Sequence, residues 1–93
     1  MEKEKKAVLI HPDDHVAVVL EDVGKGEGVR YWDGRKLHLV IAQGSISKGH
    51  KVAVRSIRPK AKVKKYGIPI GRAMKQIKRG QLVHIDNLAS FVR

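Results

Sequence analysis

The sequence feature that most constrains the fold is a series of short aliphatic runs, each ended by turn-forming residues. The run Ala7–Ile10 stops at the turn-like segment His11–Asp14, and Leu37–Ala42 follows an Asp33-Gly34 pair typical of a β-hairpin. Valine and isoleucine dominate these runs and aromatic residues make up only 4% of the chain. This pattern favours β-strands around a small aliphatic core. At 93 residues, the chain is expected to form one domain spanning residues 1–93.

We therefore predict a mainly β fold, a small barrel or clip, with one short helix. The helix is predicted because Ile70, Ala73, Met74 and Ile77 recur at helical spacing before Gly80, a common helix-ending residue. Residues 1–6 are expected to be frayed and residues 21–36, which are rich in glycine and acidic residues, to form a mobile loop. Further strands are predicted at His15–Leu20, Lys51–Ile57, Lys60–Lys64, Leu82–Ile85 and Ala89–Val92.

Charge is distributed very unevenly along the chain. Residues 1–46 carry seven lysines and arginines against eight acidic residues, whereas residues 47–93 carry thirteen against Asp86 alone. Such an asymmetry indicates an anionic partner for the second half: nucleic acid, a small carboxylate or phosphate, or an acidic protein surface. Charge alone does not distinguish among these partners.

The absence of cysteine excludes disulfides, thiolate metal sites and a thiol nucleophile in this chain. No apolar run approaches the length of about 20 residues that spans a membrane, and the charged start lacks the apolar segment of a signal peptide. We therefore expect a cytoplasmic protein without membrane contact.

Two of the five histidines, His50 and His84, are the best candidates for chemistry because each is expected at a strand edge, and His84 precedes Asp86-Asn87. Histidine, aspartate and asparagine at loop ends can hold a divalent cation or orient a hydroxy acid. The basic run Arg55–Lys65 is typical either of a solvated strand face or of a surface that tracks phosphates. Few aromatic residues are available for base stacking, and no nucleic-acid motif accompanies the charge.

Three motifs carry a resemblance to a known family. They are Gly49-His50-Lys51, then Lys65-Tyr66-Gly67 with Ile70-Gly71, then Gly80 followed by Val83-His84 and Asn87. At these positions the chain resembles the amino-terminal SAF-type domain of the altronate and galactarate dehydratase family, which includes the small subunits of sulfolactate sulfo-lyases. The resemblance implies a β-clip domain that acts with a separate large catalytic subunit.

The resemblance also implies a role in a lyase that eliminates water or sulfite from a 2-hydroxy acid, inactive without its large subunit. It implies that His50 and His84 act in catalysis, and that Lys51, Lys65, Tyr66 and Asn87 bind an anionic sugar acid. A divalent metal such as Fe²⁺, Mn²⁺ or Mg²⁺ would be shared with the large subunit, with His84 and Asp86 as ligands from this chain. The alternative is a basic β module that binds nucleic acid or an acidic protein without catalysis; the motif spacing makes nucleic acid the less favoured partner.

Two departures from the family pattern bear on these expectations. Asp86 stands where many relatives have a second histidine; a carboxylate still binds a hard cation, but the change allows a different preferred metal or substrate. The segment Arg58–Lys62 replaces a turn that is commonly acidic and glycine-bearing. We expect this basic segment to dock on an acidic surface of the large subunit.

Overall fold

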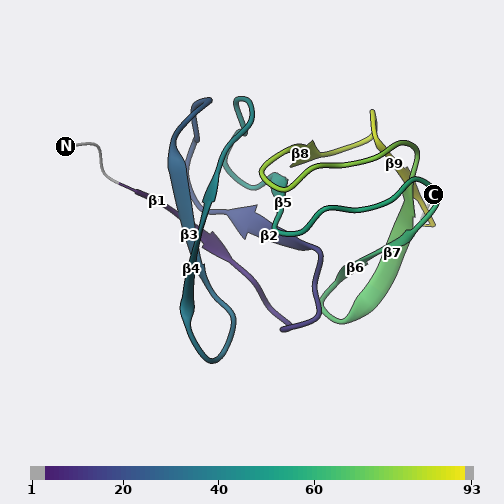
Figure 1. Cartoon of the computed structure of the whole chain (residues 1–93), viewed down its shortest axis with the longest axis horizontal. Coiled ribbons are helices and arrows are strands. Elements are labelled where there is room, and N and C mark those ends of the chain that lie inside the picture. The colour runs from purple at the N-terminus through teal and green to yellow at the C-terminus, as the bar shows by residue number, and fades with distance from the viewer. Residues whose placement is uncertain (1–3, 92–93) are drawn as a thin grey trace.

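The computed structural model describes residues 4–91, and this part of the chain contains short β-strands and no helix (Figure 1). The prediction of a mainly β fold is confirmed. No membrane-spanning helix is present between residues 4 and 91, and the cytoplasmic location stays a prediction. The strands are β1 (Lys5–Val8), β2 (Val16–Val19), β3 (Gly28–Trp32), β4 (Leu37–Ile41), β5 (Lys51–Ala53), β6 (Lys62–Lys65), β7 (Ile68–Ala73), β8 (Leu82–Val83) and β9 (Leu88–Ser90).

The larger of the two sheets has the strand order β4-β3-β1-β2-β5-β8. Within this sheet, β1 and β3 pair in parallel, and all the other neighbouring strands pair antiparallel. The predicted hairpin at Asp33-Gly34 is present as β3 and β4, which pair from Gly28 opposite Ile41 to Trp32 opposite Leu37. In Figure 1 this hairpin lies at one end of the molecule and the smaller sheet at the other.

The smaller sheet has the order β6-β7-β9, and all its pairs are antiparallel. Gly71 of β7 lies opposite Ser90 of β9. A Cβ atom at Gly71 would stand 2.3 Å from the carbonyl oxygen of Ala89, far inside van der Waals contact. Only glycine therefore permits this close approach of β7 and β9.

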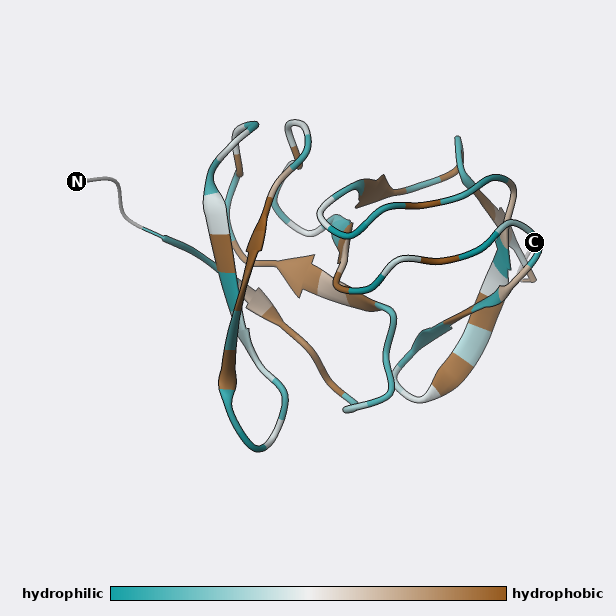
Figure 2. Ribbon diagram, in the orientation of Figure 1, coloured by the Kyte–Doolittle hydropathy of each residue, from teal (hydrophilic) through white to brown (hydrophobic). Residues whose placement is uncertain are grey.

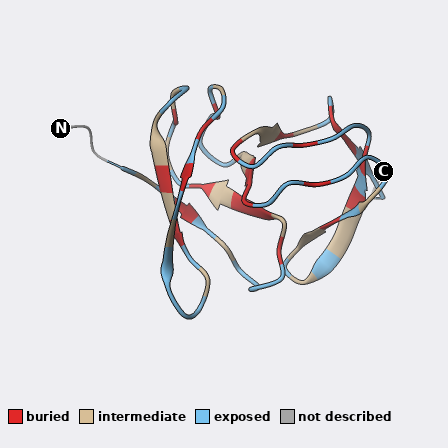
Figure 3. Cartoon of the chain, viewed as in Figure 1, coloured by how far each residue is buried: buried red, intermediate tan, exposed pale blue. Residues whose placement is uncertain are grey.

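Two apolar clusters fill the molecule, and the β2–β5 pair separates them. Ala17 and Val52 belong to the first cluster, whereas their chain neighbours Val16 and Ala53 belong to the second. Successive side chains of a strand point to opposite faces, so this short ladder is buried on both sides. Figures 2 and 3 show the apolar, buried character of these central strands. Burial on both faces holds the start of β5, and hence His50 and Lys51, on a rigid element.

The helix predicted before Gly80 is wrong. Ile70 and Ala73 lie in β7, and Ile77 forms an isolated antiparallel bridge with Ile57. Met74, which a helix would have placed on the buried face, is 60% exposed. The backbone groups of β7 form hydrogen bonds with the neighbouring strands β6 and β9. This pairing outweighs the helical spacing of a few apolar residues.

Two other expectations need correction. Residues 1–6 were expected to be frayed, but Lys5 and Lys6 belong to β1 and pair with Val29 and Arg30 of β3; residues 1–3 lie outside the described residues. The range 21–36 was expected to be a loop, but it contains β3. The alternating side chains of β3, with Val29 and Tyr31 buried, explain the strand.

Candidate functional site

The predicted site residues come from three segments: the start of β5, the turn between β6 and β7, and the loop after β8. Pairing of β5 with β8 sets Lys51 opposite Val83. This register brings His50 and His84 together, with ring centroids 5.0 Å apart and an angle of 63° between the rings. Two histidines predicted to act in catalysis, distant in the sequence, are thus neighbours in the fold.

The His50 ring is held at a turn of defined geometry. Its backbone N–H donates to the Ser47 carbonyl, its carbonyl accepts from the N–H of Val19, and Gly49 before it has φ +87°. The Nδ1 atom is buried and has no hydrogen-bond partner in residues 4–91. A buried polar atom without a partner costs about 1–3 kcal/mol, and such atoms are rare enough in proteins to call for an explanation such as a catalytic role. This observation singles out His50 within the His50–His84 pair.

Lys51 and Lys65 are close enough for their charges to interact. Burial lowers the pKa of the Lys51 ammonium, and the positive charge of Lys65 lowers it further. The Lys65 Nζ also lies 4.8 Å from the centre of the Tyr66 ring, a cation–π contact. Among the residues described, neither ammonium has a carboxylate within 4.0 Å. Two neighbouring cations without a counter-charge form a place that attracts a small anion.

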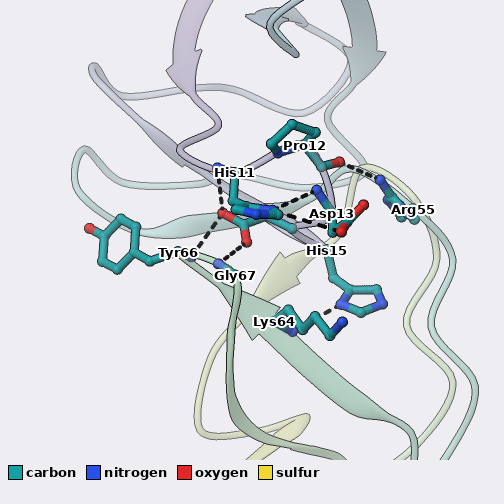
Figure 4. A network of polar contacts seen from close by, with 9 residues as sticks. His11, Pro12, Asp13, His15, Arg55, Lys64, Tyr66 and Gly67 are labelled. Carbon is teal, nitrogen blue, oxygen red and sulfur yellow. Dashed lines mark hydrogen bonds and ion pairs between the residues drawn. The ribbon is translucent and has the colours of Figure 1, made fainter.

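The backbone of the turn that carries Tyr66 is held by Asp14, which no sequence motif marks as a site residue. Tyr66 and Gly67 both have positive φ, +59° and +74°, so the β6–β7 turn is tight. The buried carboxylate of Asp14 accepts hydrogen bonds from the Tyr66 N–H at 2.9 Å and the Gly67 N–H at 2.7 Å. It also accepts from the His11 N–H at 3.1 Å. Figure 4 shows the hydrogen bonds from His11, in the β1–β2 connection, and from Tyr66 and Gly67, in the β6–β7 turn, meeting at one carboxylate.

The same region is tied together by His15. Its Nδ1 accepts a hydrogen bond from the Lys64 N–H at 2.9 Å, and its own N–H donates to the Lys64 carbonyl (Figure 4). Burial lowers the pKa of His15, with further lowering by the charges of Arg55 and Lys64. The imidazole is therefore neutral with Nδ1 as its acceptor. His15 and Asp14 together link the β1–β2 connection to the hairpin that carries Lys65 and Tyr66.

The side chain of Asn87, a predicted substrate ligand, is bonded to the backbone of its own loop. Its Oδ1 accepts from the His84 N–H at 2.9 Å and its Nδ2 donates to the Leu82 carbonyl at 2.7 Å. Both polar groups of the side chain are engaged by its own loop, as expected of a turn-forming residue. Asn87 thus positions His84.

The predicted metal ligands do not make a complete metal site. No group of three or more His, Asp or Glu side chains suited to a metal occurs within residues 4–91. Asp86 lines a groove with Gln43 and Lys75 to which His84 does not contribute, whereas the His84 ring packs against His50. A zinc-type site takes at least three protein ligands. The described residues alone do not make a site of that kind.

Comparison with known proteins agrees with the motifs. The family model of the altronate/galactarate dehydratase SAF domain matches residues 5–91. Altronate dehydratase of Bacillus subtilis is 35% identical over 83 residues, which are 89% of this chain and 16% of that protein. Galactarate dehydratase (L-threo-forming) of Escherichia coli is 36% identical over 76 residues, 82% of this chain and 14% of that protein.

A shorter relative is matched over most of its length. The (2R)-sulfolactate sulfo-lyase subunit alpha of Chromohalobacter salexigens is 35% identical over 85 residues, 87% of this chain and 89% of that subunit. The chain therefore spans about one sixth of the length of the altronate dehydratase it matches, but nearly all of the sulfo-lyase subunit. On the match over residues 5–91, the chain belongs to the altronate/galactarate dehydratase SAF domain family.

Proposed function

We propose that this chain is the small, non-autonomous subunit of a lyase that acts on an anionic hydroxy acid, and that a separate large polypeptide carries most of the catalytic machinery. The observation that carries the proposal is the coverage of 89% of the sulfo-lyase subunit alpha, a protein whose name describes one subunit of a lyase. In the dehydratases the matched region is a small part of a longer chain, and in the sulfo-lyase it is one named subunit.

Within this proposal, Lys51 and Lys65 bind the carboxylate of the substrate. Elimination next to a carboxylate builds negative charge on that group, and fixed cations stabilise it. Lys51 suits the role because burial and the neighbouring Lys65 already disfavour its charge, so an anion between the two ammonium groups relieves both costs. The Tyr66 hydroxyl, held on the turn that Asp14 fixes, orients a substrate hydroxyl.

His50 and His84 are proposed to transfer protons in the elimination. An imidazole can both accept and donate a proton, so it can take the α proton or protonate the leaving group. Their ring contact at 5.0 Å allows both to face one substrate. Any divalent cation of the assembled enzyme takes most of its ligands from the large polypeptide, because His84 and Asp86, the candidates that the family motif implies, do not line a common groove in the described chain.

The basic segment Arg58–Lys62 is proposed to contact an acidic surface of the large polypeptide. Arg58, Lys60 and Lys62 are all exposed, and none forms an ion pair within the described chain. The guanidinium of Arg72 donates to the Lys60 carbonyl at 3.0 Å, which helps to hold the turn in shape. Exposed cations on a formed turn increase the rate and specificity of association with an acidic partner.

The test is to purify a tagged chain from the cells that make it, at low salt, and to assay the complex and the isolated chain. Substrates are altronate, galactarate and (2R)-sulfolactate, with keto-acid or sulfite formation as the readout. We expect turnover by the complex and none by the isolated chain. Lys51→Gln should reduce turnover by the complex, and Lys25→Gln, an exposed lysine without side-chain partners in the described chain, should not. Rapid turnover by the isolated chain would contradict the proposal.

A further inference from the structure

A pocket of about 280 Å³ lies where the β3–β4 hairpin meets the segments that follow β1 and β5. None of the proposed substrate-binding or catalytic residues lines it. Its polar lining consists of two arginines, Arg55 and Arg79, and of Asp33 and His38, with the Tyr31 ring beside them. This volume is just below the range of about 300–1,000 Å³ that is common for ligand sites, so it suits a small molecule.

The two arginines are held in place by backbone carbonyl groups. Arg55 donates to the Pro12 carbonyl at 2.7 Å (Figure 4), and Arg79 donates to the carbonyls of Val54 at 3.1 Å and Leu39 at 3.0 Å. A guanidinium has five N–H donors, so most donors of each arginine stay available. Neither arginine has a carboxylate within 4.0 Å in the part of the chain that the structure describes. The pocket thus contains two oriented cations, neither of them ion-paired, and one carboxylate, Asp33, which is bonded to His38.

The hairpin supplies a histidine of defined orientation. His38 Nε2 lies 2.5 Å from Asp33 Oδ2, and the His38 ring stacks on Tyr31 with centroids 5.0 Å apart and an angle of 10° between the planes. The hydrogen bond with His38 lowers the pKa of Asp33 strongly, and the backbone N–H groups of Lys36 and Arg35 lower it further. Because Asp33 is ionised, Nε2 is the protonated nitrogen. In the neutral ring, Nδ1 is then a hydrogen-bond acceptor.

We propose that this pocket binds a small hydroxycarboxylate. The guanidinium groups of Arg55 and Arg79 match a carboxylate, with which arginine forms paired hydrogen bonds. The His38 ring lines the same pocket, and its Nδ1, an acceptor when the ring is neutral, matches a neighbouring hydroxyl. The Asp33 carboxylate is already bonded to His38 and to the N–H groups of Arg35 and Lys36. Inorganic phosphate would also bind the arginines, but it offers fewer hydroxyl groups that could donate to His38. The proposal does not depend on the proposed lyase function, because it concerns other residues.

The experiment is an NMR titration of the isotope-labelled full chain with L-tartrate. We expect saturable shifts at His38 and Tyr31, and an affinity at least about tenfold weaker in Arg55→Gln, equivalent to about 1.4 kcal/mol. Arg58→Gln, an exposed arginine outside the pocket, is the matched control, and Lys51→Gln removes the other anion site; both should bind at His38 as the wild type does. Absence of saturable shifts at His38, or equal weakening by Arg58→Gln, overturns the proposal.

The hydroxyl contact has a test of its own. Succinate has two carboxylates but lacks the hydroxyls of tartrate, so it should bind several-fold more weakly. His38→Phe keeps a ring to stack on Tyr31 but removes Nδ1, and should reduce tartrate binding to the level of succinate. Equal binding of tartrate, succinate and phosphate to the wild type overturns the assignment to a hydroxycarboxylate. Arg79→Lys, which keeps the charge, checks the second arginine and should bind more weakly than the wild type.

Discussion

Replacement of Asp14 by asparagine is expected to destabilise the domain and to release the turn that carries Tyr66. The Asp14 side chain is 1% exposed and accepts three backbone hydrogen bonds, from His11, Tyr66 and Gly67. Asparagine keeps one oxygen and turns an N–H₂ group toward at least one of these donors. One N–H is left without an acceptor, and the remaining bonds lose the assistance of the negative charge.

The size of the effect follows from these contacts. A buried donor without a partner costs about 1–3 kcal/mol, and hydrogen bonds to a charged group exceed neutral ones by roughly 1 kcal/mol. The sum is about 3 kcal/mol, a large part of the roughly 5–14 kcal/mol that a domain of this length has in total. For a chain of this size the loss corresponds to a Tm lower by roughly 12–24 °C.

Asp13→Asn is the matched control. Asp13 is the next residue in the chain, its side chain is 69% exposed, and its only side-chain ion-pair contact in the described residues is a 4.0 Å approach to His11. It should change stability by no more than about 0.5 kcal/mol. Urea unfolding followed by circular dichroism measures both variants, and NMR reports the Tyr66 and Gly67 amides. If Asp14→Asn is as stable as Asp13→Asn, the Asp14 carboxylate does not hold this turn.

Three further results are expected. Gly71→Ala should destabilise the domain by about 1–3 kcal/mol, because a Cβ atom there would lie 2.3 Å from the Ala89 carbonyl oxygen. Gly44→Ala, where an added Cβ would have no atom within 4 Å, should leave stability unchanged, and urea unfolding compares the two variants. Lys51→Met should be more stable than the wild type at pH 7. The Lys51 pKa is lowered in the folded state, so its charging cost is present at neutral pH and disappears as the pH rises toward the ordinary value of 10.5; an advantage that grows with pH would contradict this sign. Asp33 has a folded pKa below its ordinary value of 3.8, so its contribution is present above that pH and is lost as the pH falls further. Asp33→Asn should therefore flatten the acid side of a thermal-stability profile, and an unchanged acid side would refute this.

The alternative reading as a nucleic-acid-binding module makes a separate prediction. Phosphate tracking by the basic run Arg55–Lys65 would give micromolar or tighter binding to generic single or double strands, with a steep loss of affinity on adding salt. The family membership and the paired His50–His84 rings favour the lyase subunit, so we expect no such binding in a fluorescence-anisotropy titration at physiological salt.

Strand positions could be predicted from local pattern, but their ends and partners could not. Alternation and turn residues were enough for the β3–β4 hairpin at Asp33-Gly34. Local pattern does not predict the structure of the segment from Ile70 to Ile77. The spacing of its apolar residues fits a helix as well as a strand followed by a bridge. The bridge partner of Ile77 is Ile57, twenty residues earlier, and the close approach at Gly71 involves Ala89; neither leaves a local signal.

The candidate site shows the same division. Motif spacing identified His50 and His84, and the β5–β8 register brings them into contact. Asp14 was treated as part of a turn by its composition, whereas its carboxylate reaches across 52 residues to Tyr66. The sequence carries only a partial signal: Gly67 indicates a turn whose N–H groups need acceptors, whereas the positive φ of Tyr66 is visible only in the structure. Only the tertiary fold shows which acidic residue supplies the acceptor.

The most direct test of the central claim is the specific activity of the purified chain, measured alone and in the complex isolated from its own cells. With altronate, galactarate and (2R)-sulfolactate as substrates, we predict no turnover by the isolated chain and turnover of at least one substrate by the complex. Lys51→Gln should reduce the activity of the complex, and Lys25→Gln should not. Turnover by the isolated chain at the rate of the complex, or a complex whose activity does not change on Lys51→Gln, would contradict this claim.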